Sequence, residues 1–289
     1  MVEVLQMSRS LWDEPGSPQD IEANVRALES GKVLAFPHMP FEVSEGERNV
    51  LGSTTLGHSK NISYQASNRQ LKGCEASPEV LQQVAALMQR FADASQKLLE
   101  TVLSPYSGGL QRARTSLRPQ EIAGRQTSWR KDDTRLHVDA FPSSPTQGKR
   151  ILRVFSNINP SGKPRVWRLG GDFEEIAARY PLTPPAPGSS RLLQWLHITK
   201  SRRTEYDHHM LALHDKLKAD TDYQTGDSQG TYEFAAGTTW IVFTDQVPHA
   251  AMSGQFALEQ SFLLPVSSMQ ESARSPLRIL ERLQGRAML

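Results

Sequence analysis

The sequence lacks most features of secreted or membrane-spanning proteins. Its 289 residues include one cysteine, Cys74, so no intrachain disulfide framework is available, and a reducing compartment is the natural setting. No apolar run approaches the roughly 18 residues that a membrane-spanning helix requires. Residues 1–16 lack a basic segment followed by an apolar one. We therefore expect no signal peptide and a cytoplasmic protein.

Several catalytic and binding signatures are also missing. The sequence has no phosphate-binding loop, no Gly-x-Gly-x-x-Gly and no Gly-x-Ser-x-Gly. These absences argue against kinases, nucleotide-dependent dehydrogenases and hydrolases with a nucleophile elbow. Zinc-finger spacing, a basic zipper and an RNP-like aromatic motif are absent too, so we do not expect nucleic acid as a partner.

Positive charge is concentrated in one part of the chain, although the net charge is only +2. Residues 110–170 contain 13 Lys or Arg and 4 Asp or Glu, an excess of nine positive charges, so the remainder carries a net charge of −7. Arginine-rich segments suit ligands that bear carboxylates or phosphates. A solvated surface face is the alternative interpretation.

Hydrophobic spacing and turn residues predict helices near both ends of the chain and strands in its second half. Helices are expected from Ser17 to Gly31, from Ser77 to Pro105, over residues 205–218 and from Ser275 onward. Strands are expected at residues 33–36, 136–139, 151–158, 166–169, 192–198, 238–244 and 256–264, with a loop at 181–190. The pattern predicts a helical N-terminal part (1–109), a mainly β sandwich or jelly roll (110–270) and a C-terminal amphipathic helix (271–289).

One set of residues has the composition of a metal site. His137 and Asp139 are two residues apart, so on a strand both side chains project from the same face. His249 follows a strongly apolar strand and could complete the set. Two histidines and one carboxylate on one face of an octahedral ion form the facial triad of non-haem Fe(II) oxygenases. That triad leaves two positions for a chelating 2-oxo acid and a third for dioxygen.

A second histidine cluster is a weaker candidate. His208, His209 and His214 lie in one predicted helix, where their spacings of five and six residues do not converge on one face. The zinc-protease pattern His-Glu-x-x-His is absent. We therefore interpret this helix as structural, with its imidazoles at the surface or in hydrogen bonds.

Four longer runs resemble one enzyme family. They are RKDDTRLHVDAFP (130–142), RILRVFSNINPSGKPRVWRL (150–169), EYDHHMLALHDK (205–216) and TDQVPHAAMSGQFALEQ (244–260). Together they resemble the Kdo hydroxylases, where Kdo is 3-deoxy-D-manno-oct-2-ulosonic acid, the inner-core sugar of lipopolysaccharide. The resemblance implies a double-stranded β-helix, cupin-like, with flanking helices. It also implies hydroxylation of Kdo at C3 in Kdo-lipid A, giving Ko, with Fe(II), 2-oxoglutarate and O2. The Fe(II) ligands carry over as His137, Asp139 and His249.

The residue that anchors 2-oxoglutarate is less evident. The broader oxygenase superfamily often places an arginine about ten residues after the distal histidine, but residues 250–263 contain none. Arg153 is the first candidate and Arg118 the second, because a guanidinium grips a carboxylate with two parallel hydrogen bonds. Gln260 and Ser261 could add hydrogen bonds. A structural ion pair or a substrate contact is the alternative role for Arg153.

An acidic glycolipid substrate would give the basic segment a purpose. Candidate contacts to its carboxylate or phosphates are Arg125, Arg130, Lys131, Arg135, Arg150, Arg165 and Arg168. Trp129 and Trp167 could stack on a sugar ring or pack inside the protein.

The C-terminal helix could serve as a membrane contact. Arg274, Arg278, Arg282 and Arg286 recur every four residues, with leucines on another side. Such a helix can lie on an anionic membrane, or it can dock on the protein body or a second subunit. Peripheral attachment to the cytoplasmic face of the inner membrane is therefore one hypothesis. Two other functions stay open: an oxygenase of another small acidic substrate, and a non-catalytic β-sandwich that binds a glycolipid.

Overall fold

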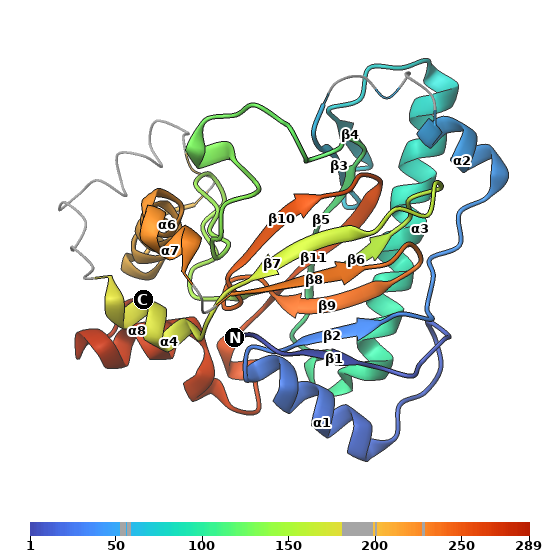
Figure 1. The fold of residues 1–289 in the computed structure, drawn as a ribbon. Coiled ribbons are helices and arrows are strands. Elements are labelled where there is room, and N and C mark those ends of the chain that lie inside the picture. Colours follow the sequence, from blue (N-terminus) through green and yellow to red (C-terminus); the bar gives the residue numbers. More distant parts are fainter. Residues whose placement is uncertain (53–55, 57–58, 181–198, 200, 227–228) are drawn as a thin grey trace.

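A computed structural model describes residues 1–52, 56, 59–180, 199, 201–226 and 229–289. Two β-sheets form the centre of the molecule (Figure 1). One group of helices covers the outer face of the larger sheet, and a second group lies at one end of both sheets (Figure 1). The predicted class, a mainly β double-stranded β-helix with flanking helices, is confirmed.

The larger sheet has eight strands. In spatial order they are β1 (Val4–Gln6), β2 (Val33–Phe36), β9 (Thr239–Phe243), β6 (Arg150–Asn157), β11 (Ala257–Leu264), β5 (Gln111–Arg118), β3 (Ile62–Gln65) and β4 (Gln70–Lys72). Neighbouring strands run antiparallel except β1 and β2, which are parallel. The strands β6, β9 and β11 are buried throughout or nearly so, as expected for a sheet covered on both faces.

The smaller sheet has three antiparallel strands in the order β10 (His249–Ser253), β7 (Arg165–Leu169) and β8 (Gly230–Phe234). Aromatic side chains fill the space between it and the larger sheet. Trp167 of β7 lies edge-to-face on Phe155 of β6, at a centroid distance of 4.9 Å, and on Trp240 of β9. The two sheets are therefore layers of one sandwich.

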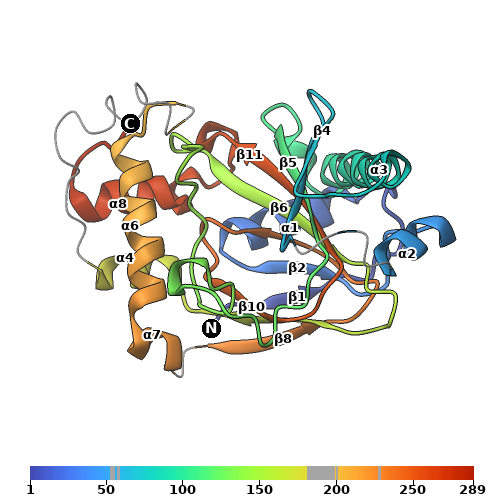
Figure 2. The ribbon, with the colours of Figure 1, turned by 90° about the horizontal axis from the view of Figure 1, so that it is seen from above.

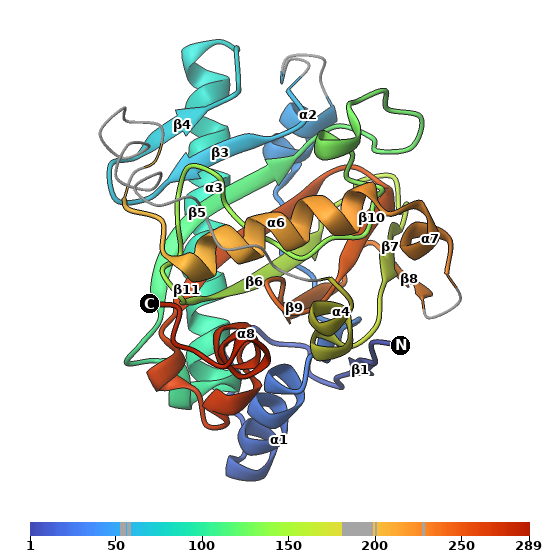
Figure 3. The ribbon, with the colours of Figure 1, turned by 90° about the vertical axis from the view of Figure 1, so that its left-hand side faces the viewer.

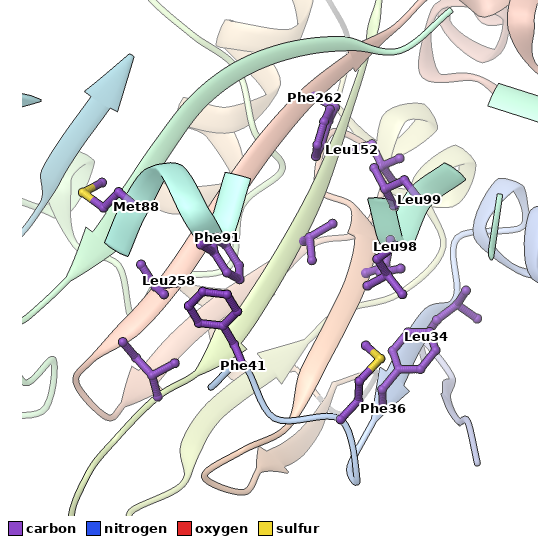
Figure 4. Packing of buried hydrophobic residues seen from close by; sticks show 14 of the residues in the cluster. Leu34, Phe36, Phe41, Met88, Phe91, Leu98, Leu99, Leu152, Leu258 and Phe262 are labelled. Atoms are coloured by element: carbon purple, nitrogen blue, oxygen red, sulfur yellow. The ribbon is translucent and has the colours of Figure 1, made fainter. Parts of the chain in front are cut away.

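Three helices from the N-terminal part are α1 (Pro18–Glu29), α2 (Glu45–Gly52) and α3 (Pro78–Val102). As predicted, Ser17 and Ser77 cap α1 and α3, each accepting a hydrogen bond from a backbone N–H of the first turn. The apolar stripe of α3 packs on the larger sheet, where Phe91 and Leu98 lie among Phe41, Leu152 and Leu258 (Figure 4). The interpretation of this stripe as core is confirmed.

The end of the sandwich is covered by α4 (Phe173–Arg179), α6 (Glu205–Ala219), α7 (Thr221–Thr225) and α8 (Pro276–Gln284). Among the described residues, short 3-10 helices lie at Ser104–Tyr106, Trp129–Lys131, Val266–Ser268 and Ser272–Arg274. Helix α6 crosses the ends of the strands (Figures 2 and 3). A capping box between Thr204 and Asp207 fixes its start. Its apolar residues pack with those of α4 and α8, which fixes the helix at this end of the molecule.

The structure corrects several predicted elements. Residues 136–139 form no regular strand, since His137 makes only an isolated bridge. Strands β1, β3, β4, β5, β8 and β10 were not predicted. Strand β2 was predicted at residues 33–36, whereas β1, β3 and β4 add unpredicted strands to the N-terminal part, so this part is less helical than expected. Such short strands owe their conformation to pairing with neighbours more than to their own pattern. The predicted loop 181–190 and strand 192–198 lie outside the described residues.

Helix α8 docks on the protein body. Leu277 and Leu280 are buried in a cluster with residues of α4 and α6. The four arginines at steps of four all pair with carboxylates: Arg274 with Glu271, Arg278 with Glu281, Arg282 with Glu174, and Arg286 with Glu205. These contacts favour docking over the membrane contact considered for this helix. Within the described ranges, no helix has both the length and the apolar character needed to cross a membrane.

Candidate metal centre and co-substrate pocket

His137, Asp139 and His249 come together at the end of the sandwich. Each offers one ligand atom, and these atoms lie within 4.8 Å of one another. His249 begins β10, and His137 lies opposite it: the backbone N–H of each donates to the carbonyl of the other, at 3.1 and 2.9 Å. The Asp139 N–H donates to the Thr244 carbonyl at 2.8 Å. Backbone pairing thus joins two stretches that are far apart in the sequence.

The ring orientations of both histidines suit metal binding. Nδ1 of His137 lies 2.8 Å from the Arg135 carbonyl, and Nδ1 of His249 lies 2.9 Å from the Val247 carbonyl. A carbonyl accepts only, so Nδ1 carries the proton and the Nε2 lone pair is free. Such a hydrogen bond on the second nitrogen is characteristic of histidine ligands.

The protonation states also fit a cation. Burial lowers the pKa of His137 and of His249, so both imidazoles are neutral near pH 7. Burial alone would raise the pKa of Asp139, but the nearby positive charges, first of all Arg153, outweigh it and keep that pKa well below its usual value. Asp139 Oδ2 is buried without a hydrogen bond among the described residues, although Arg153 Nη1 lies 2.9 Å away. The residues present therefore fit a divalent metal.

The triad opens into a cavity of about 690 Å³. Apolar walls come from Phe141, Phe155, Trp167, Ala251 and Ala257. Cations line much of the remainder: Lys60, Arg118, Arg125, Arg130, Lys131, Arg153, Arg165, Arg203 and Lys218. The pocket is thus suited to anionic ligands.

Two arginines pair with one carboxylate inside the sandwich, and a third arginine lies near them. Arg118 Nη2 lies 2.9 Å from Glu259 Oε2, and Arg153 Nη1 lies 3.4 Å from Glu259 Oε1. Arg165 donates to the Gly254 carbonyl at 2.9 Å and has no carboxylate within 4 Å in the part of the chain that the structure describes. Burial lowers the pKa of Arg165 to about 10, and neighbouring Arg118 contributes. The cluster holds an excess of positive charge.

The residues proposed to bind 2-oxoglutarate do not all lie in the pocket. Arg153 and Arg118 line the pocket, whereas Gln260 and Ser261 do not. Gln260 points to the opposite face of β11, where its Oε1 accepts a hydrogen bond from Thr115 Oγ1. Ser261 lies beside Glu259, with its Oγ 3.5 Å from Oε1. The sequence interpretation did not identify Glu259 as a site residue, although the alternation of side chains along a buried strand places it on the same face as Ala257.

Of the residues proposed to contact the substrate, some line the pocket and others do not. Arg125, Arg130, Lys131 and Arg165 line the pocket. Arg150 is wrong as a substrate contact, because its fully buried guanidinium pairs with Asp245 at 2.7 Å. Arg135 and Arg168 also lie off the pocket and donate to backbone carbonyls of Lys218 and of Gln224 and Thr134.

The two tryptophans also differ in their roles. Trp167 stacks on the His249 ring at 5.1 Å and 23°, so one face of its indole supports a ligand. Trp129 instead packs under the Arg130 guanidinium, 4.1 Å from the ring centroid.

The rival histidine cluster does not form a second metal site with described residues. His209 lies 3.1 Å from Glu205, as expected for a structural role. His214, however, lines the pocket, and its ring lies 5.1 Å from that of His137. The sequence interpretation missed this placement, because helical spacing alone does not show which face of α6 meets the pocket.

Fold and site together define a class. A double-stranded β-helix with a buried two-histidine, one-carboxylate triad opening into a cationic pocket is the architecture of non-haem Fe(II), 2-oxoglutarate-dependent oxygenases. The family profile described as 3-deoxy-D-manno-oct-2-ulosonic acid (Kdo) hydroxylase matches residues 11–287. The chain belongs to the Kdo hydroxylase family, so the resemblance noted in the sequence is confirmed.

Solved structures agree with this assignment. One is that of the Kdo hydroxylase KdoO, a non-haem Fe(II), α-ketoglutarate-dependent dioxygenase, in complex with α-ketoglutarate and Fe(III). It is 46% identical, covers 99% of this chain and 97% of that chain, and has a TM-score of 0.95. The KdoO complex with cobalt(II) is 47% identical, with the same coverage and TM-score. Comparison with curated proteins gave no match.

Proposed function

We propose that this protein hydroxylates Kdo at C3 in Kdo-lipid A, giving Ko, with Fe(II), 2-oxoglutarate and O2. The observation that supports this most is the 46% identity to KdoO over 99% of the chain, combined with the buried triad in a cationic pocket. A substrate that carries a sugar carboxylate and lipid A phosphates suits such a pocket.

His137, Asp139 and His249 would hold the iron. When bound, iron together with 2-oxoglutarate and O2 supplies the oxidising chemistry. The protein's part is to fix the ligands: the backbone carbonyls of Arg135 and Val247 orient the imidazoles, and Arg153 keeps Asp139 ionised. The apolar walls, including Trp167 against His249, would exclude water from the reacting centre.

The cluster of Arg118, Arg153 and Arg165 would bind the far carboxylate of 2-oxoglutarate. Arg118 and Arg153 share Glu259, and Arg153 also contacts Asp139, so both are partly neutralised. Arg165 has no such carboxylate within reach among the described residues and is only 7% exposed. An incoming carboxylate would neutralise it, and the ionised Glu259 would hold the other two guanidinium groups in place.

The reaction would take place at the cytoplasmic face of the inner membrane, with the enzyme attached peripherally. The membrane-embedded nature of a lipid A substrate supports this proposal. Cell fractionation tests it: we expect the protein in the cytoplasm and in a salt-extractable membrane fraction, and recovery from the periplasm would contradict it.

The experiment that tests the function is mass spectrometry of Kdo-lipid A after incubation with the protein, Fe(II), 2-oxoglutarate and air. We expect the mass of one oxygen atom added to the Kdo fragment, with succinate formed in equal amount. A control incubation without iron should give neither the mass change nor succinate. Succinate that rises without any change in Kdo would point to another substrate, and no succinate at all would exclude an oxygenase.

A further inference from the structure

Helix α6 presents a polar face to the pocket. Leu211, His214, Asp215 and Lys218 all line the cavity, and their spacing of three, four and seven residues puts them on one side of the helix. The opposite side is buried in a separate apolar cluster with α8 through Tyr206, Met210, Leu213 and Leu217. The helix is thus fixed by its apolar side, and its polar side forms a wall of the site.

Lys218 is an unusual member of this wall. Its residue is only 3% exposed, and its ammonium donates one hydrogen bond, to the Arg130 carbonyl at 3.0 Å. No carboxylate lies within 4 Å of it among the described residues, whereas Lys60 and Arg125 of the same pocket both contact Asp133. A buried ammonium without a counter-ion is costly, so an anionic partner is expected in the functional complex.

The metal triad lies close to this ammonium. His214, one turn before Lys218, has its ring 5.1 Å from that of His137. The positive charge of Lys218 helps to lower the pKa of His137, after burial and His249. Burial lowers the pKa of Lys218 itself, and the carboxylates of Asp133 and Asp139 oppose that shift. An anion bound by Lys218 would therefore lie next to the metal, on a different element from the Arg118–Arg153–Arg165 cluster of the strands.

We propose that Lys218, with His214 beside it, binds the carboxylate of the sugar acid that is hydroxylated. This inference rests on the proposed function. The pocket has two buried cations without a carboxylate in the described structure, Arg165 on β7 and Lys218 on α6, and the reaction has two anionic reactants. In a 2-ulosonic acid the C1 carboxylate is attached to C2, the neighbour of C3. Holding that carboxylate at α6 directs C3 toward the metal, whereas the phosphates of lipid A are many bonds away.

The test measures binding without turnover. The probes are the methyl glycoside of Kdo, which contains no phosphate, and the same glycoside with its carboxylate converted to a carboxamide. Each is titrated calorimetrically into protein loaded with Zn(II) and 2-oxoglutarate. The variants are Lys218→Met and Lys218→Gln, the latter retaining a donor for the Arg130 carbonyl. Lys97→Met is the matched control, because Lys97 is an exposed lysine of helix α3 that does not line the pocket.

We expect the wild type to bind the acid about 30-fold more tightly than the amide, the scale of losing one partner of a buried charge pair. Both Lys218 variants should bind the acid about 30-fold more weakly and no longer distinguish it from the amide. Lys97→Met should behave as the wild type, and 2-oxoglutarate affinity should be unchanged throughout. His214→Ala should weaken binding of the acid by a smaller factor.

Two results would overturn the subsite. The first is a Lys218→Gln variant with wild-type melting temperature that still prefers the acid. The second is a wild type that binds acid and amide equally. If either occurs while the wild type hydroxylates Kdo-lipid A, the proposed function stands and only the subsite is wrong. A wild type that neither binds the glycoside nor hydroxylates Kdo-lipid A overturns both.

Discussion

The backbones of His137 and His249 exchange two hydrogen bonds, and their imidazole centroids lie 4.8 Å apart. The pair is an isolated bridge between a loop and the first residue of β10. Their convergence is therefore set by the backbone and does not depend on a bound ion. Each ring is then fixed by a backbone carbonyl two residues earlier in the chain.

Removing either histidine should abolish catalysis without unfolding the protein. His137→Ala and His249→Ala keep the backbone bridge, since it involves no side chain. We expect succinate formation to fall at least about 1,000-fold, as for loss of an essential group, while the circular dichroism spectrum stays that of the wild type. Retained turnover in either variant would refute the assignment of that residue as a ligand.

Arg165 should govern the affinity for 2-oxoglutarate. Arg165→Met removes a buried guanidinium that has no carboxylate partner among the described residues. The KM for 2-oxoglutarate should rise about 30-fold or more, on the scale of a charge-assisted hydrogen bond in a buried site. Steady-state kinetics measure this, and Arg114→Met, at an exposed position of β5, should leave KM unchanged. An unchanged KM in Arg165→Met would move the anchor to Arg118 or Arg153.

Gly170 should be needed to position His249. Its N–H donates to the Pro248 carbonyl at 2.8 Å, and a Cβ there would lie 2.9 Å from Pro248 Cβ and 2.6 Å from the Tyr223 hydroxyl. Gly170→Ala should displace Pro248 and the adjacent ligand, weakening metal affinity about tenfold, the lower end of the loss seen when groups that orient metal ligands are removed.

Gly171→Ala is the matched control for this prediction, because its Cβ would meet nothing within 4 Å. Competition with a metal-binding dye would measure both variants. Equal affinities in the two would show that the close packing at Gly170 has no influence on the triad.

Arg150 should stabilise the fold without affecting the substrate. It is fully buried with Asp245 and its guanidinium lies over the Phe243 ring at 3.8 Å. Arg150→Met leaves the Asp245 carboxylate buried without this partner and should lower the free energy of unfolding by about 3–5 kcal/mol. Urea denaturation measures the loss. Replacing Asp245 by Leu as well should restore much of it, and a substrate KM that changes in correctly folded Arg150→Met would contradict the structural role.

The sequence predicted the elements with a clear hydrophobic pattern, including the four-residue strand β2, but it did not predict the three-residue strands. The 25-residue helix α3 and the buried strand β11 have clear periodicity and turn residues at their ends. By contrast, β1 and β4 have three residues each, too few for a pattern to distinguish them from a loop. Strand β5 carries three arginines among its eight residues, so its composition resembles a surface segment although it is paired on both sides.

The metal triad could be predicted because residue type and strand spacing limit which side chains can share an ion. The roles of the surrounding charged residues could not be predicted, since they depend on which face of each strand or helix meets the pocket. Arg150 and Arg153 lie on one strand, yet the first is sealed in the core and the second faces the triad. Lys218 lies in a helix interpreted as structural, and only tertiary packing turns one side of that helix toward the metal.

The main proposal is that His137, Asp139 and His249 hold the iron that oxidises Kdo. Its most direct test is the mass of the Kdo fragment after anaerobic loading with Fe(II) and 2-oxoglutarate, addition of Kdo-lipid A, and a single exposure to ¹⁸O₂. We expect one ¹⁸O atom on Kdo in the wild type and none in His249→Ala. A Kdo fragment of unchanged mass in the wild type, or a labelled one in the variant, would contradict it.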